Sequence, residues 1–217
     1  MRILHIVATP RGSESHSLRV SDAFLKGLAA QEGDVELDVI DLYRHELPPV
    51  AGDNIEAKYS LMVGRPIDRN HQESWRQVES LIEQFLAADM YLITAPMWNF
   101  GVPYALKYYI DCIVQPGYLF RYDETGQVVP LVNGRRMVCV TARGADYSAG
   151  SFLAPYDFQE PYLRAIFGFV GVTDIRFIHA QPMDITPHQR EAALSEAIGR
   201  ARDLGEGFRT GPAAVPA

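Results

Sequence analysis

The stretch Ala95–Asp111, APMWNFGVPYALKYYID, decides how the rest of the sequence is interpreted. It follows the apolar run 90–94, which is typical of a buried strand. An aromatic and polar loop comes next, and Pro103 then suits the first turn of a helix, where its missing N–H would have no partner. A strand, an aromatic loop and a helix in this order predict a shelf for a flat aromatic ligand, which Trp98 and Phe100 can face.

The composition of the 217-residue chain is that of a globular protein, with 47% hydrophobic and 22% charged residues. This is enough apolar material for a full core. A formal net charge of -7 argues against binding to nucleic acids or anionic membranes, because both need clustered Lys and Arg. No apolar run approaches the roughly 20 residues of a membrane-spanning helix, and the first run is too short for a signal peptide. We therefore expect a cytoplasmic protein.

The cysteines and histidines point to no metal or nucleophile chemistry. Cys112 and Cys139 lie within apolar patterns, which favours small core residues in a reducing compartment, although a disulfide between them stays open. The six histidines show no metal-ligand spacing, and no nucleophile motif such as GxSxG occurs. We predict no metal site and no catalytic side chain of the hydrolase type.

Alternation of apolar runs with amphipathic segments predicts an α/β fold with a parallel sheet and helices on both faces. The strands are expected at residues 2–8, 35–40, 90–94, 136–142 and 174–179, and the helices at 20–28, 75–86, 103–114, 155–170 and 186–204. For five strands the flavodoxin-like order 2-1-3-4-5 is the economical choice, and it places a ligand-binding switch point between the first and third strands. We expect one domain over residues 1–207 and a flexible tail over 208–217.

Three further segments have local predictions of their own. Residues 41–70 show no sustained period and contain several Pro and Gly, which predicts a long surface loop. Residues 118–126 combine an aromatic extended piece with a turn signal, which predicts a small hairpin. Thr186, with Gln189 three residues on, has the spacing of a capping box at the start of the last helix.

Three loops follow strands of the predicted sheet and should meet at one edge: residues 9–17, 96–101 and 141–145. The first is rich in hydroxyl groups and opens a helix, whose free N–H groups favour a phosphate. It carries no GxGxxG and no Walker lysine motif, so a mononucleotide fits better than a dinucleotide. The third offers backbone N–H groups at Arg143 and Gly144. A phosphate at one end and a flat ring at the other describe FMN.

Each loop also has a structural interpretation when taken alone. Ser and Thr before a helix are usually caps, aromatic residues can belong to the core, and Arg143 can be a surface charge. The convergence of three loops of complementary chemistry on one edge is what favours the binding site.

Several motifs accompany the aromatic loop, which reads PMWNF at Pro96–Phe100. They are Leu106–Lys107, Ile110–Asp111, Pro116–Gly117, Phe120–Tyr122, Thr141–Gly144, Pro161–Leu163 and Gly168–Asp174. With these motifs the sequence resembles the FMN-dependent NAD(P)H azoreductases, which are flavodoxin-like quinone reductases and usually have PMYNF in this loop. The resemblance runs from the first strand to about residue 180 and is weak over 41–70.

The resemblance implies a set of cofactor contacts. The phosphate would be held by Thr9, Ser15 and Ser17, to which charge considerations add Arg11. The ring would be held by Pro96, Met97, Trp98, Asn99 and Phe100, and its edge or ribityl chain by Thr141, Arg143, Gly144 and Ala145. Three residues depart from the family's usual pattern, namely Thr9, Trp98 and Ala145, and we expect them to tune specificity without removing FMN.

The resemblance also implies a homodimer with the active sites at the subunit boundary, where Phe100, Tyr122 and Phe169 would line the slot for flat substrates. The implied reaction passes a hydride from NADH or NADPH through FMN to quinones or aromatic azo compounds, and the cofactor carries the chemistry. Two alternatives stay open. One is a flavodoxin-type electron carrier without NAD(P)H turnover, against which the 41–70 segment and the hairpin argue. The other is a flavin-free binding module.

Overall fold

The computed structural model describes residues 1–30 and 34–208. Its centre is a parallel sheet of five strands in the order β2-β1-β3-β6-β7. The strands are β1 (Arg2–Val7), β2 (Glu36–Asp41), β3 (Met90–Pro96), β6 (Arg136–Ala142) and β7 (Asp174–Ala180). This is the predicted order 2-1-3-4-5, and it places the switch point between β1 and β3, as expected.

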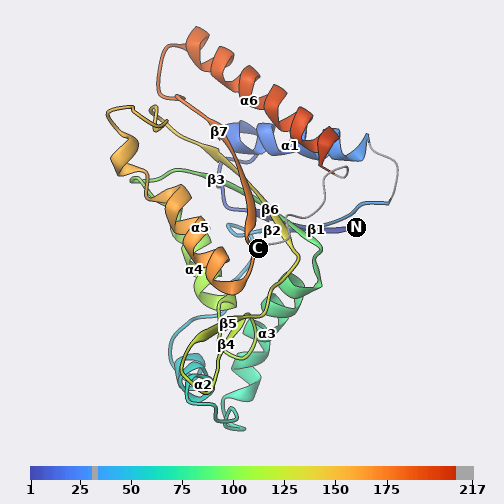
Figure 1. Ribbon diagram of the computed structural model, residues 1–217, viewed down its shortest axis with the longest axis vertical. Helices are drawn as coiled ribbons and strands as arrows, with labels where there is room; N and C mark the ends of the chain where they lie inside the picture. The colour runs from blue at the N-terminus through green and yellow to red at the C-terminus, as the bar shows by residue number, and fades with distance from the viewer. Residues whose placement is uncertain (31–33, 209–217) are drawn as a thin grey trace.

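Helices cover both faces of the sheet (Figure 1). Two of them, α1 (His16–Ala29) and α6 (Pro187–Gly207), lie on one face. The other face carries α3 (Gln72–Ala87), α4 (Tyr104–Ile113) and α5 (Gln159–Val170). The alternation of strand side chains divides the core accordingly. In β3, Met90 and Leu92 pack on the α1 and α6 side, whereas Tyr91 and Ile93 pack on the opposite side.

Helices α1 and α6 approach each other closely because glycine lies at their contact. A Cβ atom at Gly27 would overlap the carbonyl oxygen of Arg202, and one at Gly205 would overlap the carbonyl oxygen of Phe24. Both obstacles are backbone atoms, so neither could move aside cheaply. The two helices can therefore pack backbone to backbone, which brings the start of α6 close to the start of α1.

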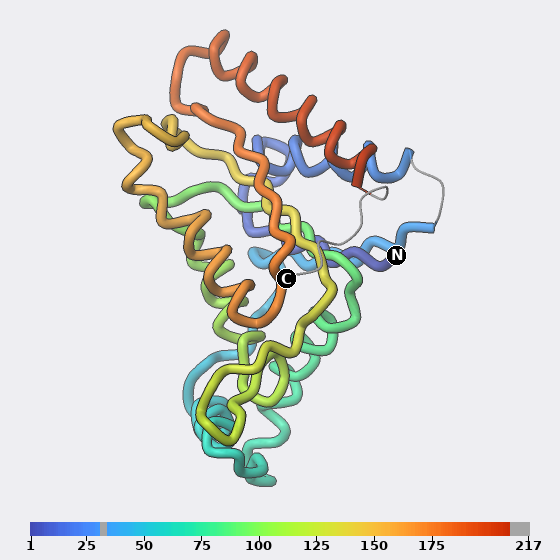
Figure 2. Tube along the Cα trace, viewed as in Figure 1, coloured from blue at the N-terminus to red at the C-terminus, as the bar shows by residue number. Residues whose placement is uncertain are grey.

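The prediction of an unbroken loop over 41–70 is wrong, because α2 (Asp53–Met62) lies within it. The helix has acidic residues in its first turn, but it buries only Asn54 and Ala57. With so little apolar surface turned inward, it shows almost no helical periodicity in its sequence. The expected hairpin is confirmed: β4 (Phe120–Tyr122) pairs antiparallel with β5 (Val128–Pro130). The hairpin and α2 lie at the end of the molecule opposite α1 and α6 (Figure 2).

The helix boundaries differ from prediction at two places. Helix α5 begins at Gln159, after a short 3-10 segment at Ala154–Tyr156, and not at residue 155. Thr186 is the N-cap of α6 but makes no side-chain capping bond. Its hydroxyl donates instead to Gln189 Oε1 at 2.7 Å, so the predicted capping box does not form. Pro155 therefore lies four residues before the true start of α5, whereas Thr186 correctly marks the start of α6 without making the expected capping bond.

The C-terminal boundary also shifts by one residue. Phe208, assigned to the tail from the sequence, is only 3% exposed and packs edge-on against Phe24, with ring centroids 5.6 Å apart. Residues 209–217, the rest of the predicted tail, lie outside the described residues. In the described part of the chain, no helix combines the length and apolarity that crossing a membrane requires.

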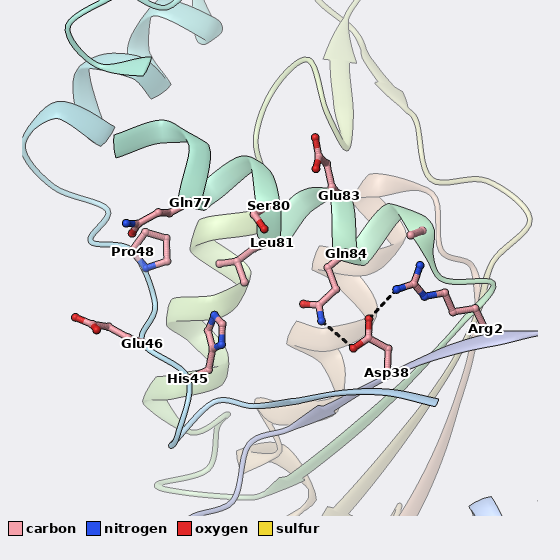
Figure 3. Close-up of a pocket in the computed structure, with 11 residues that line it drawn as sticks. Arg2, Asp38, His45, Glu46, Pro48, Gln77, Ser80, Leu81, Glu83 and Gln84 are labelled. Atoms are coloured by element: carbon pink, nitrogen blue, oxygen red, sulfur yellow. Dashed lines mark hydrogen bonds and ion pairs between the residues drawn. The ribbon is translucent and has the colours of Figure 1, made fainter. Parts of the chain in front are cut away.

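A cavity of about 810 Å³ lies between the start of β1, β2, the segment after β2 and α3 (Figure 3). Asp38 joins its walls, because it accepts hydrogen bonds from Arg2 Nη2 at 3.1 Å and from Gln84 Nε2 at 3.0 Å. His45 lies on the opposite side of this cavity. The residues that line it include none of the predicted site residues.

Candidate functional site

Two smaller cavities lie at the carboxyl ends of β1, β3 and β6. The first, of about 400 Å³, is lined by Thr9, Pro10, Arg11, His16, Pro96, Met97, Trp98, Ala142, Arg143, Gly144, Met183, Asp184 and Arg190. The second, of about 360 Å³, is lined by Met97, Asn99, Phe100, Gly144, Ala145, Tyr147 and Asp184. The two share Met97, Gly144 and Asp184. All three predicted loops therefore meet at the switch point, where ligands of such folds bind.

The hydroxyl groups of the first loop form one buried cluster at the start of α1. Ser15 caps the helix by accepting from the backbone N–H of Leu18 at 3.3 Å. The Thr9 hydroxyl donates to Ser15 Oγ at 3.1 Å, and Ser15 and Ser17 share a hydrogen bond of 3.0 Å. Thr9 lines the cavity, whereas Ser15 and Ser17 lie behind its wall. Ser15 is thus a helix cap, as the structural interpretation predicts. The N-terminus of α1 lies beside the cavity, because His16, the first residue of the helix, lines it.

Basic side chains surround the same end of the cavity. Arg11, named from the sequence, lines it together with His16 and Arg190, which sequence reasoning missed. Arg190 is held in place because Nε donates to the Met183 carbonyl at 2.6 Å and Nη2 to the Ile185 carbonyl at 3.0 Å. No sequence pattern could have linked Arg190 to this site, since only the packing of α6 on α1 brings it there. This local positive charge, in a protein of net charge -7, suits an anionic group.

The aromatic loop is a tight turn with an unusual backbone. Trp98 and Gly101 exchange two backbone hydrogen bonds, of 3.1 and 2.9 Å, around Asn99 and Phe100. Both central residues are left-handed, with φ of 46° for Asn99 and 69° for Phe100. Asn tolerates this region, but for Phe it costs about 1–2 kcal/mol. The turn leaves Trp98 and Phe100 37% and 41% exposed, and each of them lines one of the two cavities. The strain is therefore stored at the edge of the candidate site.

In the third loop, the long side chain of Arg143 is bound to other residues of the protein, which leaves mainly the backbone of the loop to contact a ligand. Arg143 is 1% exposed, and its guanidinium donates to Asp157 at 2.9 Å and to Thr141 Oγ1 at 3.1 Å. Thr141 is fully buried, bonds His179 Nδ1 at 2.8 Å and lines neither cavity. Burial lowers the pKa of the Arg143 guanidinium, against the opposing effect of the Asp157 carboxylate. Arg143 Nη2 has no hydrogen-bond partner among the described residues.

Helix α5 fastens these loops to one another, through residues that the sequence did not single out. One Asp157 oxygen accepts from the backbone N–H groups of Gln159 and Glu160 at 3.0 and 3.1 Å, while the other holds Arg143. The Gln159 side chain donates to the Pro96 carbonyl at 2.8 Å. An Asp shortly before an amphipathic helix is a recognisable N-terminal signal, and it could have identified Asp157.

Gly144 packs closely against the segment that leads into α6. Its carbonyl accepts from the backbone N–H of Asp184 at 2.8 Å, and a Cβ atom at position 144 would overlap the Asp184 carboxylate. Glycine therefore fits this wall while the Asp184 side chain keeps its present position. Ala145, the next residue, lines the neighbouring cavity.

Tyr122 and Phe169 lie together but away from both cavities. Phe120 joins them, since its ring centroid is 5.7 Å from Tyr122 and 4.8 Å from Phe169. Neither residue lines either cavity. A single chain therefore does not bring these two residues to the aromatic loop.

The chemistry of the walls fits FMN. Buried hydroxyls, a helix N-terminus and the side chains of Arg11 and Arg190 suit a phosphate, and exposed aromatic side chains suit a flat ring. The unpartnered Arg143 Nη2 and His16 Nδ1 are buried donors or acceptors that a bound polar group could satisfy. By contrast, the described residues hold no cluster of three or more His, Cys, Asp or Glu that could bind a metal.

A family model described as a flavodoxin-like fold matches residues 1–204. The chain belongs to this flavodoxin-like family. The FMN-dependent NADH:quinone oxidoreductase of Nitratidesulfovibrio vulgaris is 41% identical over 204 residues, which cover 93% of this chain and 97% of that protein. The FMN-dependent NADH:quinone oxidoreductase 1 of Bradyrhizobium diazoefficiens is 35% identical over 207 residues, or 95% and 99% of the two chains.

Among solved structures, the flavodoxin-like chain is similar to an azoreductase from Bacillus anthracis str. Sterne, with 25% identity, a TM-score of 0.85 and coverage of 96% and 100%. It is also similar to an FMN-dependent NADH-azoreductase from Bacillus anthracis str. Ames Ancestor in complex with FMN. That match has 26% identity, a TM-score of 0.85 and coverage of 96% and 99%. The resemblance seen in the sequence motifs is thereby confirmed.

Proposed function

We propose that this protein is an FMN-dependent NADH:quinone oxidoreductase that also reduces aromatic azo compounds. The observation that carries the proposal is the pair of adjoining cavities at the switch point. One is lined by Thr9, Arg11 and Arg190, and the other includes the aromatic residues Phe100 and Tyr147. The relatives' names support both the cofactor and the reaction, and they favour NADH over NADPH as the reductant.

Bound FMN would supply the hydride chemistry, and the chain's own residues would bind and orient it. Thr9, Arg11 and the start of α1 would hold the phosphate. Trp98 and Phe100 would flank the ring system. The backbone of Gly144 and Ala145 would face the ring edge, where N–H groups stabilise negative charge in the way of an oxyanion hole. No side chain is assigned as an obligatory acid.

The active assembly in this proposal is a homodimer. Several aromatic side chains are exposed on the single chain, and the largest exposed fraction is that of Phe152, at 88%. Tyr122 and Phe169 are also exposed and lie apart from the cavities of their own chain. A second copy that covered them would complete a slot for flat quinones and azo compounds at the boundary. Light scattering of the purified protein measures this directly, and a monomer at assay concentration contradicts it.

A cytoplasmic location belongs to the same proposal. Cys112 and Cys139 are both buried free thiols, which suits a reducing compartment. Burial raises the pKa of the Cys112 thiol to about 12, so neither its environment nor its exposure favours reaction.

The deciding experiment is anaerobic mixing of the FMN-loaded protein with NADH, and separately with NADPH, followed by a quinone. We expect NADH to bleach the yellow flavin and the quinone to restore the colour over many cycles. An electron carrier would bind FMN without this turnover, and no finding favours that alternative. A protein that takes up no FMN would instead be the flavin-free binding module.

A further inference from the structure

The proposed function assigns no role to the side chain of His16. It is the first residue of α1, it is half-buried, and its ring lines the cationic cavity with Arg11 and Arg190. Its Nδ1 atom is buried and has no hydrogen-bond partner among the described residues. A buried polar atom without a partner is unfavourable, so a ligand group that bonded it would be stabilised there.

The charges that face His16 come from four parts of the chain. Arg11 approaches from the loop after β1, Arg19 from α1, and Arg190 from α6. Glu191 of α6 opposes them but is itself paired with Arg19, with a nitrogen to oxygen distance of 3.5 Å. Asp184, in the segment before α6, lines the same cavity. The surroundings of His16 are therefore mainly cationic.

These surroundings favour the neutral form of the imidazole while the cavity holds no anion. Burial, followed by the charges of Arg11, Arg19 and Arg190, lowers the pKa of His16, and Glu191 only partly offsets them. A phosphate dianion placed among the same cations would act with the opposite sign, because a nearby negative charge favours the imidazolium. Ring protonation would also make Nδ1 a donor.

We propose that His16 binds the cofactor phosphate as an imidazolium, so that the protein takes up a proton when FMN binds. This inference rests on the proposed function and adds the regulation of its phosphate site by pH. The bound state holds more protons than the free state, so linkage makes the affinity for FMN increase as pH falls. Riboflavin, which lacks the phosphate, would not share this dependence.

The test is the dissociation constant of FMN for the flavin-free protein and for His16→Gln, measured from about pH 6 to about pH 8.5, the range in which histidine changes charge. Gln is polar but cannot be protonated. The phosphate's own titration, with a pKa of about 6, affects both proteins equally, so the ratio of their constants isolates His16. We expect the wild-type protein to bind about tenfold more tightly at the acid end and equally at the alkaline end.

Three controls sharpen the result. His16→Lys carries a permanent cation, so the ratio of its FMN dissociation constant to that of His16→Gln should change little with pH. His45→Gln, at the remote cavity of Figure 3, should follow the wild-type protein. Calorimetry in two buffers of different ionisation enthalpy should detect proton uptake with FMN, less uptake with His16→Gln, and none with riboflavin.

A ratio that stays flat with pH overturns the inference while leaving the proposed function intact, and so does equal pH dependence for riboflavin. Failure of the wild-type protein to bind FMN at any pH overturns the proposed function itself.

Discussion

Asp157 serves two partners at once: one carboxylate oxygen accepts from the first backbone N–H groups of α5, and the other holds the buried Arg143 guanidinium at 2.9 Å. The helix start and the loop after β6 are therefore fixed by one side chain. Gln159 extends the connection to the aromatic loop through Pro96. The shape of the ring-binding end thus depends on a residue that lines neither cavity.

Replacing Asp157 with Asn should destabilise the protein strongly. Asn can still accept the α5 hydrogen bonds, but it removes the carboxylate that pairs directly with the Arg143 guanidinium, which is 1% exposed. Loss of one partner of a buried pair costs about 3–5 kcal/mol, measurable by urea unfolding. The double change Arg143→Met and Asp157→Asn, which removes the buried cation but keeps the α5 hydrogen bonds, should recover much of this loss. As a control, Asp203→Asn on the exposed side of α6 should change stability by less than about 0.5 kcal/mol.

Phe100→Gly should separate stability from cofactor affinity. Glycine adopts the φ of 69° without strain, but the ring contacts with Tyr147 and Tyr156 are lost, so stability should change by less than about 1 kcal/mol. The ring face is lost, however, and FMN should bind up to about tenfold more weakly. Fluorescence titration with FMN measures this. Tyr59→Ala removes an exposed ring of α2 that lines neither cavity, and this variant should bind FMN as the wild-type protein does. Equal weakening in both variants would refute the role of Phe100.

Gly27→Ala should disrupt the seam between α1 and α6. The added methyl group meets the Arg202 carbonyl, a backbone atom, and overpacking of this kind costs about 1–3 kcal/mol. The matched control is Gly199→Ala on α6, where an added Cβ meets no atom within 4 Å, and it should stabilise the protein by about 0.5–1 kcal/mol. Thermal unfolding of the two variants in parallel decides the question, and a shift in the same direction for both would contradict it.

Glu160 should contribute to acid sensitivity. Its hydrogen bond to His179, together with Arg164, lowers the pKa of the carboxyl from 4.5 to about 2. A carboxyl with a lowered pKa stabilises the folded state above its unfolded value, and this contribution is lost as pH falls from about 4.5 towards 2. In Glu160→Gln, unfolding free energy should therefore depend less on pH in that window. Identical pH profiles for the variant and the wild-type protein would show that folding does not lower the pKa of the Glu160 carboxyl.

The inner strands of the sheet could be predicted because they are nearly continuous apolar runs, which buried parallel strands require. Residues 136–142 and 90–94, for example, need no tertiary information to be recognised. Helix α2 could not be found in this way, since it buries only Asn54 and Ala57 and so leaves no periodic trace. Burial is not the only signal, because β2 buries only Ile40 and was predicted from the alternation of Val35, Leu37 and Val39.

The candidate site divides along similar lines. The loops after β1, β3 and β6 were found because sheet topology alone brings their ends together. His16 and Arg190 were missed because their proximity depends on the packing of two helices from opposite ends of the chain. Arg143 was assigned to the cofactor edge from the sequence, yet its guanidinium is directed to Asp157. Topology can predict which loops meet, but the direction of a long side chain depends on partners that topology does not reveal.

The glycine contact between α1 and α6 has a consequence for biosynthesis. The cationic cavity takes His16 from near the beginning of the chain and Arg190 from near its end. During synthesis, His16 therefore leaves the ribosome long before Arg190. In the proposed function both residues belong to the phosphate end of the FMN site. Cofactor loading should accordingly be a late event that awaits emergence of α6, and unloaded nascent chains should be the form most exposed to cellular proteases.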